Sequence, residues 1–119
     1  MSRIALAASI INGLIAAGHT VKGFEIFASP TWKSLPKLLF AYARVGWYQG
    51  SVFFAIAGLY TYQLSQRSPA TWTGIDRIIV GMTSLLYLGS SAWYYKNGDG
   101  ATGTLVAVAG AVQGSILTS

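Results

Sequence analysis

The sequence predicts an all-α integral membrane protein, folded as a bundle of four transmembrane helices. Hydrophobic residues make up 53% of the 119 residues and charged residues only 9%, whereas soluble domains carry about 25% charged residues. The apolar residues gather into long continuous runs that short polar turns separate. These runs lack the period-two alternation that a membrane β-barrel requires. So few charges cannot cover a soluble particle of this size, and we expect lipid to cover much of its surface.

The apolar runs predict one domain with four spans, at residues 3–27, 36–66, 73–95 and 101–117. At about 1.5 Å per residue, the first run is just long enough to cross a bilayer core of about 30 Å. The second run is longer than the core requires, which predicts a tilted or protruding helix. Prolines and glycines in the connections mark where each helix must end.

The basic residues indicate an orientation in the membrane but no nucleic-acid partner. The net charge of +5 comes from 8 basic and 3 acidic residues that are scattered along the chain, whereas phosphate binding needs a clustered basic surface. Lys and Arg are more numerous beside the first and third connections, so the positive-inside rule places these connections in the cytoplasm. We expect membrane lipid as a partner, and the endoplasmic reticulum as the membrane if the protein is eukaryotic.

Other features limit the chemistry. The chain has no cysteine and one histidine, so it offers no disulfide and no metal or haem site, and we expect no cofactor. In the last run, Gly103, Gly110 and Gly114 predict a face for close helix packing, which also offers a surface for homo-oligomer formation.

Each of the first three runs carries a stripe of polar residues at helical spacing. Polar side chains are costly in hydrocarbon, so we expect the stripes to face the bundle interior or a wet cavity. The stripes consist of Asn12, His19, Lys22 and Glu25; of Arg44, Tyr48, Ser51 and Tyr62; and of Asp76, Thr83, Tyr87, Ser90 and Tyr94. Because consecutive helices are antiparallel, one end of the bundle should bring together His19, Lys22, Glu25, Arg44, Tyr48, Gln49, Trp93 and Tyr94.

The same residues also suit structural roles. Glu25 and Lys22 have the spacing of an ion pair one turn apart. Asp76 begins the third run beside Arg77, where a carboxylate interacts favourably with the helix dipole. Asp99 lies in an Asn-Gly-Asp-Gly turn. Tryptophans and tyrosines at the ends of the runs suit the aromatic belt at a membrane surface.

Two short stretches, Gly18–Gly23 (GHTVKG) and Gly46–Ser51 (GWYQGS), carry a resemblance. They resemble the small membrane epoxide hydrolases of fungal polyketide pathways, of the aurovertin and citreoviridin type. In size and helix number, the resemblance extends over most of the chain. It implies water-driven opening of a polyene-derived epoxide, a reaction that needs an acid to protonate the leaving oxygen and a base to activate water.

We therefore expect an enzyme that acts on a lipophilic small molecule by acid–base chemistry. Glu25 is the expected general acid or base, with His19 as its partner. Tyr48 would donate to the departing oxygen, and Arg44 would stabilise the developing negative charge. Asp76 is the reserve carboxylate. The residues expected to bind substrate are Trp47, Gln49, Trp93 and Tyr94.

Two other functions remain open. Four helices in this length also suit a small multidrug exporter, but such an exporter needs a carboxylate near the middle of its first helix. The only acids are Glu25, Asp76 and Asp99, and none lies in mid-helix. A structural subunit that binds other helices through its glycine faces is the second alternative, and it predicts no enclosed polar cavity.

Overall fold

The structure is a computed structural model that describes all residues, 1–119, and it is helical throughout, with 87% helix and no strand. The long helices are α1 (Arg3–Ala28), α3 (Lys37–Ser65), α4 (Gly74–Lys96) and α5 (Gly100–Ser115). Their ends lie within two residues of the predicted segments. The shorter elements are α2 (Pro30–Lys33), η1 (Pro69–Thr71) and η2 (Ile116–Thr118). The one-turn helix α2 occupies a connection in which no helix was expected.

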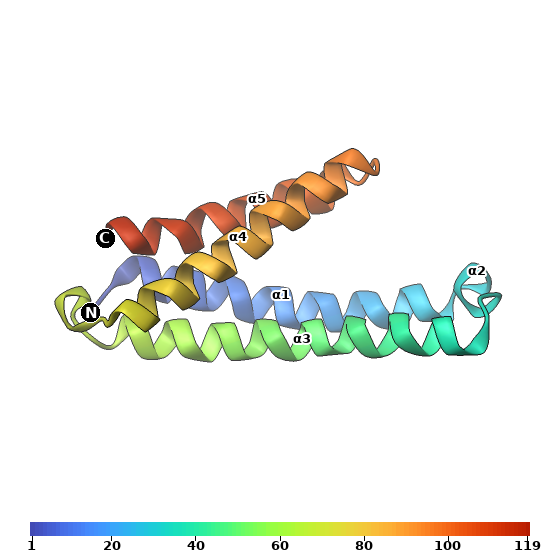
Figure 1. The fold of residues 1–119 in the computed structure, drawn as a ribbon, viewed down its shortest axis with the longest axis horizontal. Coiled ribbons are helices and arrows are strands. Elements are labelled where there is room, and N and C mark those ends of the chain that lie inside the picture. The colour runs from blue at the N-terminus through green and yellow to red at the C-terminus, as the bar shows by residue number, and fades with distance from the viewer.

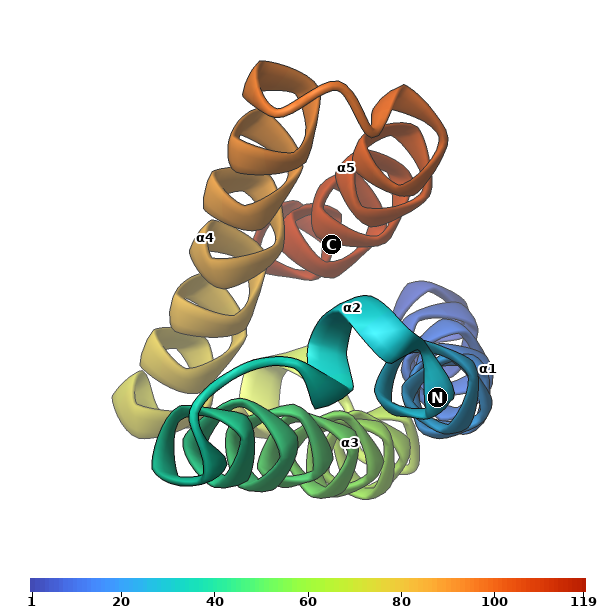
Figure 2. The same ribbon diagram turned by 90° about the vertical axis from the view of Figure 1, so that its right-hand side faces the viewer.

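The long helices pair into two antiparallel hairpins, α1 with α3 and α4 with α5 (Figure 1). The hairpins meet at the end that holds both chain termini and the α3–α4 connection. Toward the other end, the α4–α5 hairpin diverges from α1 and α3 (Figures 1 and 2). The expected four-helix bundle therefore exists only at the end where the hairpins meet, and the molecule is elongated, with a longest dimension of 52 Å.

An apolar core fills the end where the hairpins meet. The indole Nε1 of Trp72 donates to the backbone oxygen of Leu64 at 3.2 Å, which fixes the α3–α4 connection against α3. The backbone nitrogen of Ser2 donates to the backbone oxygen of Ser65 at 2.9 Å, so the start of the chain is held there too. The members of the core are Ala5, Ala8, Leu64, Trp72, Val80 and Ile116.

A buried polar contact, which we call the polar clamp, joins the hairpins next to this core. It consists of Asn12 on α1, Tyr87 on α4 and Gln113 on α5, each 1% exposed. The Asn12 Nδ2 donates to Gln113 Oε1 at 3.0 Å, and the Tyr87 hydroxyl donates to Asn12 Oδ1. Two of the predicted stripe residues, Asn12 and Tyr87, thus face the interior as expected. Tyr62 does not, because its side chain is 51% exposed.

Small residues bring α4 and α5 close together. The Ser84 hydroxyl donates to the backbone oxygen of Gly110 at 2.8 Å, and the Ser91 hydroxyl to that of Gly103 at 2.7 Å. A Cβ atom at Gly110 would lie 2.9 Å from the nearest side-chain atom of Leu88. The predicted close packing of the glycine face is confirmed. Because α4 already fills this face, it is not available for contacts between copies of the chain.

Two helical segments are long and apolar enough to cross a membrane. They are α1, Arg3–Ala28, with a mean hydropathy of 1.7, and Gly100–Thr118, with 1.4. By length and composition alone, they weakly indicate that the protein associates with a membrane.

The glycine contacts predict a position-specific effect on stability. We expect Gly110→Ala to lower the free energy of unfolding by about 1–3 kcal/mol, because the new methyl group overpacks a filled interface. Gly89→Ala is the control, because a Cβ at this helical position meets nothing within 4 Å and alanine favours helix by up to about 1 kcal/mol. Thermal unfolding of the purified proteins in detergent measures both. Equal stability of the two variants would contradict the packing described above.

Candidate functional site

His19 on α1 is held against α3 by a polar and an aromatic partner. Its Nδ1 lies 2.8 Å from the hydroxyl oxygen of Ser51. Its ring stacks on that of Trp47, with 4.0 Å between centroids and 9° between planes, and it meets the edge of Phe54 at 5.1 Å. The indole Nε1 of Trp47 also donates to the backbone oxygen of His19 at 2.7 Å. Since Ser51 occupies Nδ1, the free ring position for proton transfer is Nε2.

Glycines allow this close approach of α1 and α3. A Cβ atom at Gly23 would lie 2.7 Å from the ring of Trp47, and one at Gly50 would lie 3.1 Å from Cε1 of His19. Glycine is the residue that permits such contact without displacing the neighbouring side chain. The two stretches that carry the resemblance therefore lie against each other, although they are far apart in the sequence.

Two adjoining hollows lie between this contact and the end of the hairpin that carries α2. The larger is a shallow, open groove of about 790 Å³ on one face of α3, which supplies all eight of its lining residues, Val45 and Val52 among them. The smaller has about 350 Å³ and adds Phe24 and Phe27 of α1 and Lys33 of α2. Three residues line both hollows: Phe40, Arg44 and Tyr48. The smaller hollow is lined by α1, α2 and α3 together, and its mostly apolar lining with a few polar groups is typical of small-molecule sites.

Aromatic rings form the wall of the smaller hollow. Phe27 is 7% exposed and lies at the centre of this wall. Its ring meets those of Trp32 at 5.5 Å, Phe40 at 5.8 Å and Tyr48 at 6.1 Å between centroids. Edge-to-face and tilted arrangements at these distances are favourable. The wall fixes the position of Tyr48, whose ring faces α1.

Of the residues expected to carry out catalysis, Arg44 and Tyr48 line the hollows and Glu25 does not. The Glu25 Oε1 accepts from the Lys22 Nζ at 3.1 Å, and the two side chains are 73% and 55% exposed. This is the ion pair one turn apart that the spacing allowed. No hydrogen bond joins Glu25 to His19 or Tyr48. Exposed pairs of this kind contribute only about 0–1 kcal/mol to stability.

Of the residues expected to bind substrate, Gln49 lines the groove and Trp47 stacks on His19, but Trp93 and Tyr94 lie elsewhere. They belong to the end of α4, where the hairpins diverge (Figure 2). Trp93 is 66% exposed, and the Nζ of Lys96 lies 5.0 Å from its ring centroid. The expected convergence of α4 with α1 and α3 at this end is wrong, because it assumed that the four helices stay together along their whole length.

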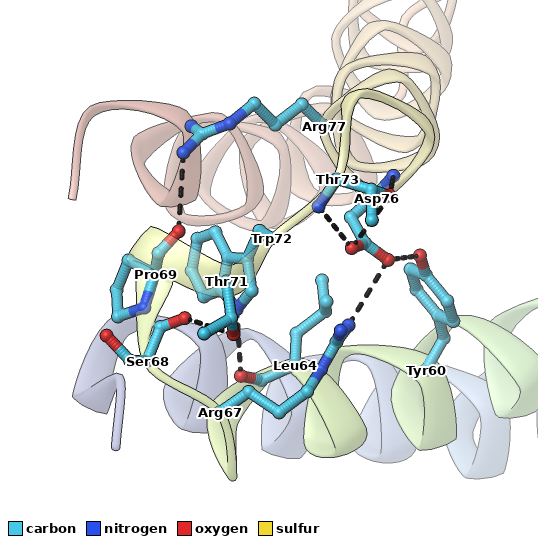
Figure 3. Close-up of polar contacts among 10 residues, drawn as sticks. All are labelled: Tyr60, Leu64, Arg67, Ser68, Pro69, Thr71, Trp72, Thr73, Asp76 and Arg77. Atoms are coloured by element: carbon cyan, nitrogen blue, oxygen red, sulfur yellow. Dashed lines mark hydrogen bonds and ion pairs between the residues drawn. The ribbon is translucent and has the colours of Figure 1, made fainter.

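Asp76 lies at the opposite end of the hairpin, in a network that joins α3 to α4 (Figure 3). Its Oδ2 accepts from the backbone nitrogen of Thr73 at 2.7 Å, and the Thr73 hydroxyl accepts from the backbone nitrogen of Asp76 at 3.2 Å. This is the capping box that starts α4. The other carboxylate oxygen of Asp76, Oδ1, accepts from the Tyr60 hydroxyl and from Arg67 Nη2, the latter at 3.2 Å. The neighbouring cation Arg77 contacts the η1 turn instead.

Asp99 performs the turn role that its sequence context indicated. Its Oδ1 accepts from the backbone nitrogen of Thr102 at 3.1 Å, which caps α5. Hydrogen bonding by Thr102 lowers the pKa of the Asp99 carboxyl below its usual value. Gly98 beside it has a φ of 88°, a conformation that glycine adopts without strain. None of the three acids in the chain lines a hollow.

Sequence reasoning missed most of the apolar lining. Phe40, Arg44, Tyr48 and Val52 follow one another at intervals of four, and such a row shares one face of a helix. That spacing was a usable signal for the α3 side of the groove. No comparable signal placed Phe27 of α1 beside it, because the contact depends on how α1 and α3 pair.

The arrangement offers binding groups rather than a metal centre. No three histidine, cysteine, aspartate or glutamate side chains lie close enough together to hold a metal ion. The hollows present the phenol of Tyr48, the amide of Gln49 and the guanidinium of Arg44, which can donate hydrogen bonds to a ligand. Comparisons of the chain with protein-family models, with curated proteins and with solved structures find no match.

Proposed function

We propose that this chain is an integral membrane protein whose four long helices all span the bilayer, and that it binds a lipophilic small molecule in the two hollows of the α1–α3 hairpin. The observation that carries the proposal is the distribution of side chains. Large apolar side chains face outward on every long helix, and they surround an interior with many polar groups.

The outward-facing side chains are among the largest apolar ones in the chain. Leu14 of α1 is 68% exposed, Leu59 of α3 72%, Leu85 of α4 71% and Leu105 of α5 60%. The buried residues, by contrast, include ten polar or charged ones and ten apolar ones. In water, this distribution would forgo about 25 cal/mol for each Å² of apolar surface left exposed. In a bilayer, the exposed apolar surface is solvated by lipid and the polar groups pair inside, as α-helical membrane proteins require.

The hollows support the binding part of the proposal. They open on the outer surface of the hairpin, which lies within the bilayer if α1 and α3 span it. A lipophilic molecule dissolved in the membrane then reaches them without crossing water. The aromatic wall around Phe27 gives a bound molecule a rigid apolar surface, which costs little conformational entropy on binding.

The resemblance supports a narrower proposal, in which the bound molecule is an epoxide that water opens to a diol. A base takes a proton from water, the water oxygen bonds to an epoxide carbon, and an acid protonates the oxygen released when the other C–O bond breaks. Tyr48 supplies that proton, and Arg44 stabilises the charge on the oxygen. The proposed base is Glu25, which does not line the hollows but follows Phe24 of the smaller one, and which must turn toward that hollow from its weak, exposed pairing with Lys22.

Insertion by four spans predicts a specific pattern of accessibility. The natural chain has no cysteine, so single cysteines at Ser34, Ser68, Asn97 and Ser119, all exposed, report one position each. We expect a membrane-impermeant thiol reagent to label Ser34→Cys and Asn97→Cys from one side of sealed vesicles, and the other two variants from the opposite side. Labelling of Ser34→Cys and Ser68→Cys from the same side would exclude a spanning α3.

Filling the groove should prevent binding. A photoreactive fatty alcohol that carries a diazirine in its chain should label the segment 37–52, as located by mass spectrometry of peptides. We expect Ala41→Trp to reduce this labelling several-fold, because Ala41 lines the groove and an indole fills it. Ala55→Trp, at an exposed position of α3 outside both hollows, should label like the parent protein. Labelling spread evenly over the outer faces of all helices would show that there is no specific site.

The narrower proposal predicts that Glu25→Gln lowers the rate of diol formation from a lipophilic epoxide by about 10²–10⁴-fold, because the amide cannot take a proton. Lys22→Gln is the matched control, since it breaks the same ion pair and keeps the carboxylate. Turnover is measured by mass spectrometry with protein in detergent and no added cofactor. In oxygen-18 water, the first turnover should place one labelled oxygen in the diol. Equal rates for the two variants would remove Glu25 from the mechanism.

A further inference from the structure

Three cations surround the two hollows, and no acid accompanies them. Lys33 lines the smaller hollow, Lys37 the larger one, and Arg44 both. The two ion pairs of the chain involve other residues, so these three cations have no carboxylate partner in the protein. The linings of both hollows contain no aspartate or glutamate. The positive charge around the hollows is therefore unbalanced by the chain itself.

The charged and apolar parts of the groove are ordered along α3. Lys37 is the first residue of the helix, and Arg44 follows seven residues later, about 10 Å further along the axis. Val45 and Val52 continue the lining toward the middle of the helix. The two cations of the groove thus lie in the half that begins beside α2, and the lining beyond Arg44, which consists of Val45, Tyr48, Gln49 and Val52, carries no charge.

From this order and charge, we infer that the hollows hold a single-chain amphiphile with an anionic head, a carboxylate or a phosphate monoester. This inference rests on the proposed binding function and narrows its ligand. A guanidinium donates two parallel hydrogen bonds to such a head, so Arg44 is its main partner, and Lys37 adds a second cation. The chain of the ligand lies along Val45 and Val52. The groove covers one side of the ligand, because α3 alone lines it.

The same cations have a simpler explanation. Lysines and arginines at the ends of spanning helices extend toward the headgroups of the bilayer and interact with anionic phospholipids. That explanation predicts that any anionic lipid neutralises them and that the apolar lining adds nothing. The amphiphile inference predicts instead that head charge and the groove act together on one molecule.

The test compares two photoreactive probes that differ only in the head: a diazirine-bearing palmitic acid and the corresponding hexadecanol. The protein is placed in nanodiscs of neutral phosphatidylcholine at about pH 9, where a carboxylic acid with a membrane-raised pKa is still ionised. We expect the acid to label the segment 37–52 about 10- to 100-fold more than the alcohol, because charge-assisted hydrogen bonds contribute about 1.5–3 kcal/mol and about 1.4 kcal/mol is a factor of ten in affinity. Unlabelled palmitate should suppress this labelling.

Variants then assign the preference to the cations. Arg44→Gln and Lys37→Gln should lower labelling by the acid toward that by the alcohol, and should leave labelling by the alcohol unchanged. Arg3→Gln is the control, because Arg3 is an exposed cation at the other end of the hairpin. It removes the same charge and should keep the preference for the acid.

Each other result has a distinct meaning. Suppression of the labelling by phosphatidylglycerol in the nanodisc, at the same molar excess as palmitate, would make this a phospholipid headgroup site and overturn the inference. Suppression by acetate or inorganic phosphate would make it a site for small anions and overturn it too. Equal labelling of the segment by acid and alcohol would refute the anionic head while the proposed lipophile site stands. No labelling of the segment by either probe would refute the site itself.

Discussion

The polar clamp of Asn12, Tyr87 and Gln113 is the contact on which the arrangement of the two hairpins depends. Within each hairpin, the helices touch along their length, but the hairpins meet each other only at one end. Between helices in lipid, there is no hydrophobic driving force, so association relies on packing and on hydrogen bonds. All three clamp residues are almost fully buried. Asn12 bonds both other members, so its removal leaves the Tyr87 hydroxyl and the Gln113 amide buried without these partners, which is the costly outcome in an apolar interior.

The Asp76 network adds a second tie and limits how the hairpins can rotate. It connects Tyr60 in the last turns of α3, and Arg67 in the α3–α4 connection, to the first turn of α4. The clamp residue Tyr87 lies about three turns beyond Asp76 along α4, so two separated polar contacts fix both the position and the angle of α4. The angle sends the far end of α4 away from α1 and α3 (Figures 1 and 2).

The sequence predicts the helix ends well because residues at or next to each end determine where the helix begins or stops. Pro36, Pro69 and the Asn97–Gly100 turn stop or start helices by their own geometry, and the glycine face of α5 reveals its close packing through the lack of side chains. The burial of Asn12 and Tyr87 was likewise predictable, because polar groups avoid lipid. The divergence of the hairpins was not predictable, since it results from contacts between residues 75 positions apart. The prediction of which residues meet at one end assumed that all four helices stay together. Because the hairpins diverge, Trp93 and Tyr94 lie away from Arg44.

Because the hairpins end at different heights, the proposed insertion is asymmetric across the membrane. The α4–α5 turn ends short of the α1–α3 connection along the long axis (Figure 1). If both turns reach the same membrane surface region, α2 and the first turn of α3 stand among the headgroups, and the groove beneath them belongs to one leaflet only. A molecule that enters it exchanges laterally with that leaflet and never passes the midplane. With the proposed binding function, the occupancy of the groove would follow the composition of a single monolayer, and it would change when lipids flip between the monolayers.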